Sequence, residues 1–517
     1  MSNSKIKLLW IDDEVDFLRP YVYFLQEKGY EVETASNGPD GIQLVKQQNF
    51  DLVLLDEMMV GMDGLTVLQT IKEIDPNILV AMVTKCQEEE IMNQAFAQLV
   101  DDFIVKPFTP VQILAALKRL VEKKTIIAEH IKRDFAKIFL SRSQIKTFED
   151  WVSHYKNIIR WQNLINRFGD EILQQSFNDE KRESNRQFVD YIVENYRLWL
   201  IEKNKGPILS HQFLRHFVLP KLREKPVFLF IFDSMRMDQW LACVPFLKEI
   251  FDIKEEFYCS LLPSATPYAR NAIFAGMLPL DIYQRCKSDW VFDDTAQNRF
   301  EPVLLQKFLQ SQAYNNKVLY LKTSSNEDIE NSQESLIQLQ PIKDHSGYYP
   351  LATVIINFLD LLIHSTKSAR LIEELITDDQ SLLNITRVWF SSSSILSLLK
   401  KLKNRDCHII ITSDHGFIKV ERPTIITGGR EISANLRYKY GGALKVDPKT
   451  AIILSQPEEY MLPAEHLGIR FVIAKSDYYF IYSTKPKEYE KTYKHSYQHG
   501  GVSMEEMILP VGFLSSK

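Results

Sequence analysis

The stretch Cys407-His408-Ile409-Ile410-Ile411-Thr412-Ser413-Asp414-His415-Gly416 runs from a series of apolar residues straight into an acid, a histidine and a glycine. An isoleucine-rich run of this length is typical of a strand buried in a parallel sheet. Ligand-binding and catalytic groups in open α/β sheets lie at the carboxyl ends of such strands. Asp414 and His415 are therefore placed where they could bind a divalent metal such as zinc, although an Asp-His pair at a strand end is often simple turn chemistry.

Two other segments offer partners for this pair. The apolar run Pro226–Phe232 predicts a second strand that ends at an acid, Asp233. Asp360 and His364 are four residues apart, which on a helix puts a carboxylate and an imidazole on one face, where they can share a metal. The same spacing is common in surface ion pairs, so the alternative for these two residues is a purely structural role.

A glycine-containing segment offers a further imidazole. His499 is followed by two glycines, which let the backbone approach a site closely. His495, four residues earlier, is the alternative ligand. Ser503 and Glu506 then form the capping-box pattern that predicts the start of a short helix.

A candidate nucleophile lies at Thr266. Pro267 suits the first position of a helix and Thr266 suits its N-cap. A hydroxyl there lies at the positive end of the helix dipole, where phosphate binds readily. Threonine is a poor nucleophile unless a metal or a base activates it. Arg270 and Asn271, on the same helix, are candidate substrate contacts, and a solvated helix face is the alternative for both.

The metal candidates sort into two sets. Two metals about 3.5–4 Å apart could hold the attacking and leaving oxygens of a phosphoryl transfer. Over residues 207–517 the order of the candidates resembles that of the alkaline phosphatase superfamily, most closely its PglZ branch. The resemblance implies a threonine nucleophile and two zinc ions. One ion would be held by Asp233, Asp414, His415 and Thr266, and the other by Asp360, His364 and His499.

Acidic, hydroxyl and lysine side chains also follow the predicted strands of residues 1–122. Asp12 and Asp13 follow the first strand, Asp56 follows the third, Thr84 ends the fourth and Lys106 ends the fifth. These positions share one rim of a parallel sheet. Three carboxylates there form an oxygen site suited to Mg²⁺, and a lysine ammonium can contact phosphoryl oxygens.

This set resembles the receiver domain of two-component response regulators. The loop Asp56–Gly64 fits the family pattern D-x-x-M-x-G-M-D-G, and Lys106 is followed by proline. The resemblance implies that Asp56 accepts the phosphoryl group. The other residues that it implies are Asp12, Asp13, Asp56 and the Met58 carbonyl for one Mg²⁺, Thr84 and Lys106 for the phosphoryl group, and Phe103 as the switch aromatic.

The pattern along the chain predicts a multidomain α/β protein. Residues 1–122 alternate strands with amphipathic helices, as in a doubly wound, flavodoxin-like receiver. Residues 123–205 contain a single glycine and repeat apolar residues at helical spacing, which predicts a helical bundle or connector. Residues 206–517 return to strand and helix alternation, and we expect an alkaline-phosphatase-like α/β domain there.

Within these domains we expect the following elements. The strands are Ile6–Ile11, Glu31–Ala35, Asp51–Leu55, Ile78–Thr84, Asp102–Val105, Pro226–Phe232, Lys317–Leu321, Cys407–Thr412, Ala451–Leu454 and Tyr478–Ser483. The helices are Asp16–Lys28, Ile126–Leu140, Phe148–Phe168, Phe188–Ile201, Pro350–His364 and Ser391–Leu402. Trp151, Trp161 and Trp199 are expected to pack in the core of the helical part.

Composition limits the compartment and the partners. Five cysteines, an odd count without a CxxC pair, argue against a disulfide framework and fit a reducing cytoplasm. No apolar run approaches the ~20 residues of a membrane span, and we expect neither a secretory leader nor a membrane partner. The net charge of −5 gives no general argument for nucleic-acid binding.

Together, the two resemblances imply a response regulator of the kind that controls type IX secretion. The leading hypothesis is a zinc-dependent phosphodiesterase, rather than a monoesterase, that acts on a nucleotide or oligonucleotide. A sensor histidine kinase would phosphorylate Asp56, and the phosphorylated receiver would form a homodimer, a two-state shift that needs ~5.5 kcal/mol of differential stabilisation. The alternative is a signalling scaffold without essential catalysis that binds a sigma factor or the kinase.

Overall fold

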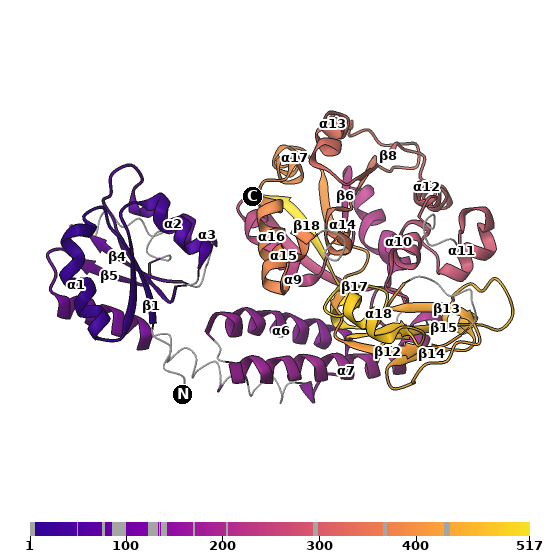
Figure 1. Cartoon of the computed structure of the whole chain (residues 1–517). Coiled ribbons are helices and arrows are strands. Elements are labelled where there is room, and N and C mark those ends of the chain that lie inside the picture. The colour runs from indigo at the N-terminus through magenta and orange to yellow at the C-terminus, as the bar shows by residue number, and fades with distance from the viewer. Residues whose placement is uncertain are drawn as a thin grey trace. The chain divides into compact units, whose positions relative to one another are not determined.

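The computed structural model describes most of the chain, and the chain divides into two compact units (Figure 1). The described residues are 6–48, 50–74, 78–84, 100–122, 133, 135, 142–168, 171–202, 205–292, 298–365, 370–428 and 435–517. The first unit comprises Met1–Phe139 with Trp161–Phe177, and the second comprises Leu140–Arg160 with Asn178–Lys517. None of the helices in the described ranges combines the length with the apolar composition that a bilayer span requires.

The first unit contains a five-stranded parallel sheet with the strand order β2-β1-β3-β4-β5. Its elements are β1 (Ile6–Ile11), α1 (Val15–Glu27), β2 (Tyr30–Ala35), α2 (Gly38–Gln47), β3 (Leu52–Asp56), α3 (Gly64–Ile74), β4 (Leu79–Thr84) and β5 (Asp102–Val105), and residues 110–122 are helical. Leu52 and Leu54 belong to one apolar cluster, whereas Val53 and Leu55 belong to another. Because neighbouring strand residues point to opposite faces, both faces of this sheet are covered. The expected doubly wound, flavodoxin-like fold is confirmed.

Two long helices form the connector, α6 (Phe148–Phe168) and α7 (Glu171–Ile201). In the second unit, Trp151 of α6 packs edge-on against Phe188 of α7, with ring centroids 5.3 Å apart, and Figure 1 shows these helices side by side. Trp199 is also buried, so the core role expected of both tryptophans is confirmed. The helix expected at Ile126–Leu140 falls largely outside the described residues.

The second unit is built around a six-stranded mixed sheet with the order β7-β18-β10-β6-β9-β8. Its strands are β6 (Val227–Phe232), β7 (Phe251–Cys259), β8 (Val318–Thr323), β9 (Leu351–Ile356), β10 (His408–Ser413) and β18 (Ile508–Ser516). Strands β8, β9, β6 and β10 are parallel, whereas β18 runs antiparallel to both β10 and β7. Every residue of β6 and of β9 is buried, as in parallel strands covered on both faces. The expected second α/β domain is confirmed.

The remaining elements of the second unit are helices around this sheet and three small sheets. The helices are η2 (Ser210–Gln212), η3 (Leu214–Val218), α8 (Leu219–Leu222), α9 (Met237–Lys248), α10 (Thr266–Ala275), α11 (Pro279–Arg285), η4 (Lys287–Asp289), α12 (Glu301–Ser311), α13 (Asn326–Ile337), α14 (Phe358–Ser365), α15 (Arg370–Leu375), α16 (Asp379–Ser391), α17 (Ser394–Leu402), η5 (Pro457–Tyr460), α18 (Pro486–Tyr493) and α19 (Met504–Met507). The small sheets pair β11 (Ile418–Lys419) with β17 (Tyr497–Gln498), β12 (Arg422–Ile426) with β16 (Tyr478–Tyr482), and β15 (Ile469–Ala474) with both β13 (Tyr438–Gly442) and β14 (Ala451–Leu454).

The segment Pro350–His364, expected as one helix, is a strand followed by a helix. Strand β9 takes Leu351–Ile356, and α14 begins at Phe358. The strand sequence Leu-Ala-Thr-Val-Ile-Ile is rich in β-branched residues, and all of it is buried between β6 and β8. A fully buried strand lacks the polar alternation that distinguishes a strand from a helix, so the helical prediction is wrong for this part.

The strand register brings the acidic residues to one edge of the sheet. Phe232, the last residue of β6, lies opposite Ser413 of β10 and Ile356 of β9. Asp233 and Asp414 therefore leave neighbouring strands side by side, and the Asp233 backbone N–H donates to the Ile356 carbonyl at 2.9 Å. The residues that follow three adjacent parallel strands, β9, β6 and β10, therefore lie together at the carboxyl edge of the sheet.

His154 of α6 is buried in surroundings that disfavour its charged form. Its exposed fraction is 4%, and its Nε2 lies 2.9 Å from the Ser184 hydroxyl. Burial, together with the charge of Arg142, lowers the pKa of His154 to about 4. A histidine in an unfolded chain has a pKa of about 6.5, so the unfolded chain binds the additional proton first as the pH falls.

We expect the second unit to lose stability as the pH falls from about 6.5 to about 4, and His154→Gln to remove part of that loss. Near pH 5 the contribution of His154 amounts to about 2 kcal/mol. Urea unfolding near neutral pH and near pH 5 measures it, with His345→Gln at an exposed site as the control. If His154→Gln keeps the pH dependence of the parent protein, the histidine is not its source.

Candidate metal centre

Asp233, Asp414 and His415 come together at the ends of β6 and β10. All three are buried, and one ligand atom of each lies within 4.8 Å of the others. His415 Nε2 is 3.7 Å from Asp233 Oδ1 and 3.7 Å from Asp414 Oδ2. Because its Nδ1 lies 3.0 Å from the Gly416 carbonyl, which can only accept, Nδ1 carries the proton. The lone pair of Nε2 therefore faces the carboxylates, ready for a hydroxyl or a metal.

Thr266 adds a hydroxyl to this set. Its Oγ1 is 2.8 Å from His415 Nε2 and 3.4 Å from Asp233 Oδ1. Thr266 is the first residue of α10, and Ala265 is the N-cap. The expectation that Thr266 itself is the N-cap is therefore wrong by one residue. Its hydroxyl contacts the candidate ligands, which leaves it available for chemistry.

Arg270, one turn further along α10, offsets part of this negative charge. Its Nη1 donates to Asp233 Oδ2 at 2.5 Å and lies 3.6 Å from Asp414 Oδ2. Its Nε donates to Glu301 Oε1 at 2.7 Å. Both Arg270 and Asn271 are buried, so the alternative of a solvated helix face is wrong. Arg270 thus commits its Nε and Nη1 donors to carboxylates, and its predicted contact with substrate stays a prediction.

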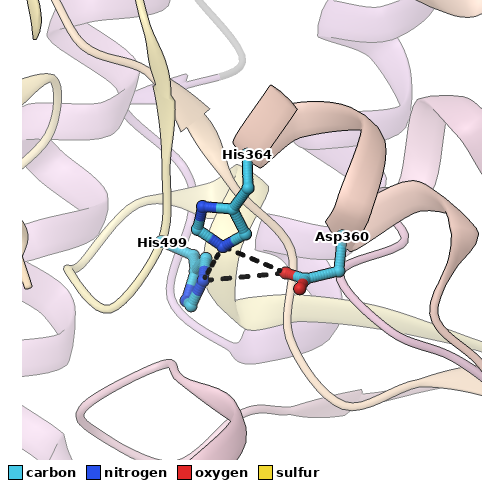
Figure 2. Close-up of side chains that lie close together, drawn as sticks. All are labelled: Asp360, His364 and His499. Atoms are coloured by element: carbon cyan, nitrogen blue, oxygen red, sulfur yellow. Dashed lines mark hydrogen bonds and ion pairs between the residues drawn. The ribbon is translucent and has the colours of Figure 1, made fainter. Parts of the chain in front are cut away.

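Asp360, His364 and His499 form the second set (Figure 2). His364 Nε2 is 3.4 Å from Asp360 Oδ1, and His499 Nε2 is 3.8 Å from the same oxygen. The two Nε2 atoms are 3.2 Å apart. Helix α14 supplies the first two residues one turn apart, and the segment after β17 supplies the third. Half of the His364 side chain is exposed, so this set borders solvent.

Two contacts tie the sets together. The rings of His415 and His499 stack with centroids 4.4 Å apart. Ser234, the second residue after β6, donates its backbone N–H to Asp414 Oδ1 at 3.3 Å and its hydroxyl to Asp360 Oδ1 at 2.8 Å. Ser234 is buried at a φ of 67°, a left-handed conformation that residues other than glycine seldom adopt. Sequence reasoning missed Ser234, although a serine directly after a strand-terminal acid was the signal that could have identified it.

Burial and like charge dominate the protonation of this centre. Burial raises the pKa of Asp233 to about 7 against the opposing charge of Arg270, and the charges of Asp414 and Asp360 raise it further. Burial, with the charges of the neighbouring imidazoles, holds the pKa of His499 well below its usual range. His499 is therefore neutral, which is the form that binds metals.

A divalent cation fits each set. Asp414 Oδ2 is buried and accepts no hydrogen bond from the described residues, so a cation would supply its missing partner. The Nε2 atoms of His364 and His499 face each other beside one carboxylate oxygen, where neutral imidazoles could both donate to one cation. Carboxylate oxygens and neutral imidazole nitrogens are the donors that zinc takes in proteins. The residues therefore fit two divalent ions, one in each set.

The structure separates His499 from its alternative, His495. His495 Nδ1 lies 2.9 Å from Glu421 Oε2, and 54% of the His495 side chain is exposed. His499, in contrast, is buried beside Asp360 and His364. The geometry thus favours His499 as the ligand.

The short helix α19 holds the segment that carries His499. Its N-cap is Ser503, whose side chain accepts from the Glu506 backbone N–H at 3.2 Å, so the predicted cap is confirmed. The Glu506 carboxylate also accepts from the Gly501 backbone N–H at 2.8 Å. The Ser503 hydroxyl donates in turn to Glu506 Oε2 at 2.8 Å, so this acid holds both the N-cap and the loop two residues beyond His499.

In the first unit, the predicted phosphorylation residues also meet. Ligand atoms of Asp12, Asp13 and Asp56 lie within 4.8 Å of one another. Lys106 Nζ is 3.1 Å from Asp12 Oδ2 and 3.0 Å from Asp56 Oδ1. A Cβ on Gly64 would lie 2.2 Å from the Asp56 carbonyl oxygen, so only glycine allows the loop after Asp56 to fold back so closely.

The charges of this receiver site are strongly coupled. Burial raises the pKa of Asp56 against the hydrogen bond from Lys106, and the charge of Asp12 raises it further. Burial alone would lower the pKa of Lys106, but its hydrogen bonds to Asp56 and Asp12 outweigh burial and raise it. Crowded carboxylates of this kind are the donors that Mg²⁺ prefers.

Three further receiver residues lie where the sequence places them. Thr84 ends β4. Phe103 of β5 packs, partly buried, against the apolar cluster on one face of the sheet. Met58 lies after β3, and its side chain is exposed. The predicted magnesium contact of this residue is through its backbone carbonyl. Their roles in switching and in magnesium binding stay predictions.

Comparison with protein families divides the chain into three matches. Residues 8–118 match the response regulator receiver domain. Residues 119–200 match the PorX response regulator linker domain. Residues 213–512, more than half of the chain, match the BREX system PglZ alkaline phosphatase-like domain. The predicted combination of a receiver with a PglZ domain is confirmed.

The curated relatives and solved structures named below each match less than a third of the chain. The transcriptional regulatory protein ResD of Bacillus subtilis is 33% identical over 120 residues, which are 23% of this chain and 50% of ResD. SrrA of Staphylococcus aureus is 28% identical over 164 residues, 32% of this chain and 58% of SrrA, so the chain spans about half the length of these relatives. A CheY-like receiver domain protein from Methanospirillum hungatei matches with 29% identity and a TM-score of 0.22 over 24% of this chain and 98% of its own. TrrA from Thermotoga maritima, solved with Mg²⁺ and BeF, matches with 29% identity and a TM-score of 0.21 over 22% and 98%.

We expect His499→Ala to lose about one zinc ion per chain and His495→Ala to lose none, because only His499 faces the Asp360 and His364 donors. Elemental analysis of zinc-loaded and desalted protein measures the content. Equal zinc content in the two variants would remove His499 from the ligand set.

Proposed function

Because this chain belongs to the family of PglZ alkaline phosphatase-like proteins and carries a response regulator receiver domain, we propose that it is a phosphorylation-controlled zinc phosphodiesterase. The receiver domain implies a phosphodonor such as a sensor kinase. The PglZ domain suggests a phosphoesterase. Zinc, the threonine nucleophile and the diester substrate are our proposals.

The observation that carries the proposal is the position of the Thr266 hydroxyl. It lies 2.8 Å from the lone pair of His415 Nε2 and 3.4 Å from Asp233, at the N-terminus of α10. The helix dipole there favours negative charge on an incoming phosphoryl group. Zinc held by Asp233, Asp414 and His415 would lower the pKa of the hydroxyl and offset charge on the phosphoryl oxygens.

Thr266 acts in the first of two displacements. Its oxygen bonds to phosphorus as the bond from phosphorus to the leaving alcohol breaks, the hydroxyl proton passes to water, and the departing alkoxide takes a proton from water. Arg270 holds Asp233 in place through this step by its 2.5 Å hydrogen bond. A phosphothreonine ester, carrying the remaining alcohol of the diester, is the product.

A water molecule completes the second displacement. Its oxygen bonds to phosphorus beside the Asp360, His364 and His499 set as the bond between phosphorus and the Thr266 oxygen breaks. The attacking water gives up a proton to solvent, the Thr266 oxygen takes one back, and a phosphomonoester leaves. Ser234 contacts both sets, so it keeps the residues of the two half-reactions at a constant separation.

The charge balance favours a diester over a monoester. A monoester dianion carries one more negative charge, which a free guanidinium or ammonium group beside the nucleophile would offset. Arg270, one turn after Thr266, gives its Nη1 and Nε donors to Asp233 and Glu301, so these two carboxylates already offset its charge. A nucleotide or oligonucleotide with a singly charged diester linkage is therefore the substrate class that we propose.

The receiver would control this reaction. We propose that phosphorylation of Asp56, with Mg²⁺ held beside it, drives formation of a homodimer and changes the output of the PglZ domain. Type IX secretion is the output that we propose, as the two resemblances in the sequence imply, and residues 119–200 match a response regulator linker domain. Binding of a sigma factor without catalysis is the alternative output, and the nucleophile variant below separates the two.

We expect Thr266→Val to lower kcat for bis(p-nitrophenyl) phosphate by roughly 10³-fold or more while both zinc ions stay bound, because the nucleophile is lost. Thr266→Ser keeps a hydroxyl and should retain measurable turnover. Undiminished hydrolysis by Thr266→Val would show that another group attacks phosphorus. Type IX secretion restored by Thr266→Val in a deletion strain would favour the scaffold.

We expect beryllofluoride with Mg²⁺ to double the mass in solution from 60.3 kDa per chain, because it mimics the phosphoryl group on Asp56. Asp56→Asn should stay at the mass of one chain, and Asp16→Asn, an exposed receiver aspartate, should respond as the parent does. Light scattering coupled to size exclusion measures the mass. An unchanged mass in the parent protein would exclude control through dimer formation.

A further inference from the structure

Helix α19 contacts both of the loops that present the imidazole ligands. The Glu506 carbonyl accepts from the Gly416 backbone N–H at 3.0 Å, directly after His415. The Glu506 carboxylate accepts from the Gly501 backbone N–H in the other loop at 2.8 Å. A Cβ on Gly416 would lie 2.0 Å from the Glu505 carbonyl oxygen, so the two backbones are in direct contact. A displacement of α19 would therefore move both loops.

Asn185 of the connector helix α7 holds the start of α19. Its Oδ1 accepts from the Met504 backbone N–H at 2.8 Å, and its Nδ2 donates to Glu505 Oε2 at 2.9 Å. Asn185 is 3% exposed and Glu505 is 2% exposed. One amide thus serves a backbone donor and a carboxylate that would both be costly to leave unpaired in the interior.

Lys181, one turn earlier on α7, pairs with the other oxygen of the same carboxylate. Its Nζ lies 3.4 Å from Glu505 Oε1 and 3.7 Å from Asp379 Oδ2. Asp379 in turn accepts from Arg236 Nη1 at 3.1 Å, and Arg236 lies two residues after Ser234. The connector helix therefore reaches the residues around the metal sets by two routes.

We infer that Asn185 and Lys181 are positioning residues for the metal centre. Through Glu505 they hold α19 in place, and α19 holds the loops that present His415 and His499. In this buried network Asn185 uses both ends of its amide and Glu505 is held at one oxygen by a hydrogen bond and at the other by the Lys181 ion pair, which leaves few alternative arrangements. A misplacement of about 1 Å in a site of this kind is enough to impair it. The inference rests on the proposed function for its kinetic readout, but its metal readout does not need hydrolysis.

The decisive variant is Asn185→Leu in the full chain, which keeps the number and branching of the side-chain heavy atoms and removes both hydrogen bonds. We expect zinc to bind roughly tenfold more weakly and kcat to fall roughly tenfold with KM nearly unchanged. This is the lower end of the loss in metal affinity or activity that follows when a residue supporting the ligands is replaced. Competition with a chromophoric zinc chelator measures the affinity, and hydrolysis of bis(p-nitrophenyl) phosphate measures the kinetics.

Ser184→Ala is the matched control. Ser184 is buried on the same helix, but its hydroxyl contacts His154 and Glu180 instead of α19. We expect this variant to lower the melting temperature while zinc affinity and kcat stay at the parent values. Asn185→Asp combined with Glu505→Gln exchanges donor and acceptor and keeps an acceptor for the backbone of α19, so it should restore the zinc affinity that Asn185→Leu loses.

Parent zinc affinity and parent kcat in a folded Asn185→Leu protein would overturn the inference. If Asn185→Leu does not fold, Lys181→Met carries the same two readouts, and parent values there overturn it equally. A parent protein that hydrolyses no phosphoester refutes the proposed function alone. A tenfold loss of zinc affinity in Asn185→Leu would still support the positioning role in that case.

Discussion

Asp233 and Asp414 bring two carboxylates of like charge together away from water. The surrounding structure must supply positive charge that compensates them. The hydrogen-bonded register of β6 and β10 forces these acids together, and the strands before them are too buried to let either side chain turn to solvent. Arg270 offsets one charge and is itself held by Glu301. Like charges at such proximity disfavour ionisation unless a cation lies between them. Arg270 already supplies part of this compensation, and a divalent cation held where the two strands end would supply the rest.

The ligands were accessible to sequence reasoning because each follows a signal that depends on few neighbours. Asp233 and Asp414 end continuous apolar runs, and such runs become buried parallel strands whatever the rest of the fold is. Asp360 and His364 keep one helical turn between them, so their partnership was predictable even though the strand before them was mistaken for helix. The receiver acids and Lys106 were predictable for the same reason, since strand ends in a parallel sheet share one rim.

The features that sequence reasoning did not reach depend on tertiary contacts. Burial on both faces removed the alternation from β9, so no local pattern separated it from a helix. Ser234 acts through a left-handed backbone and two hydrogen bonds to distant segments. The residue type predicts neither this backbone conformation nor these hydrogen bonds. Asn185 and Glu505 are 320 residues apart in the chain, and in isolation each is an ordinary polar residue on a helix. Their importance comes only from being enclosed together.

Strand β18 lies in the sheet between β7 and β10, yet it follows every one of the ligand residues in the chain. On the ribosome, all of the acids and imidazoles therefore emerge before the strand that joins the two parts of their sheet. Until β18 pairs, β7 and β10 each leave backbone groups open to other chains, and closing so distant a contact is slow. A nascent chain thus contains every candidate ligand while it still lacks the frame that sets their distances. Its risk of aggregation therefore depends on the order of synthesis as well as on the final fold.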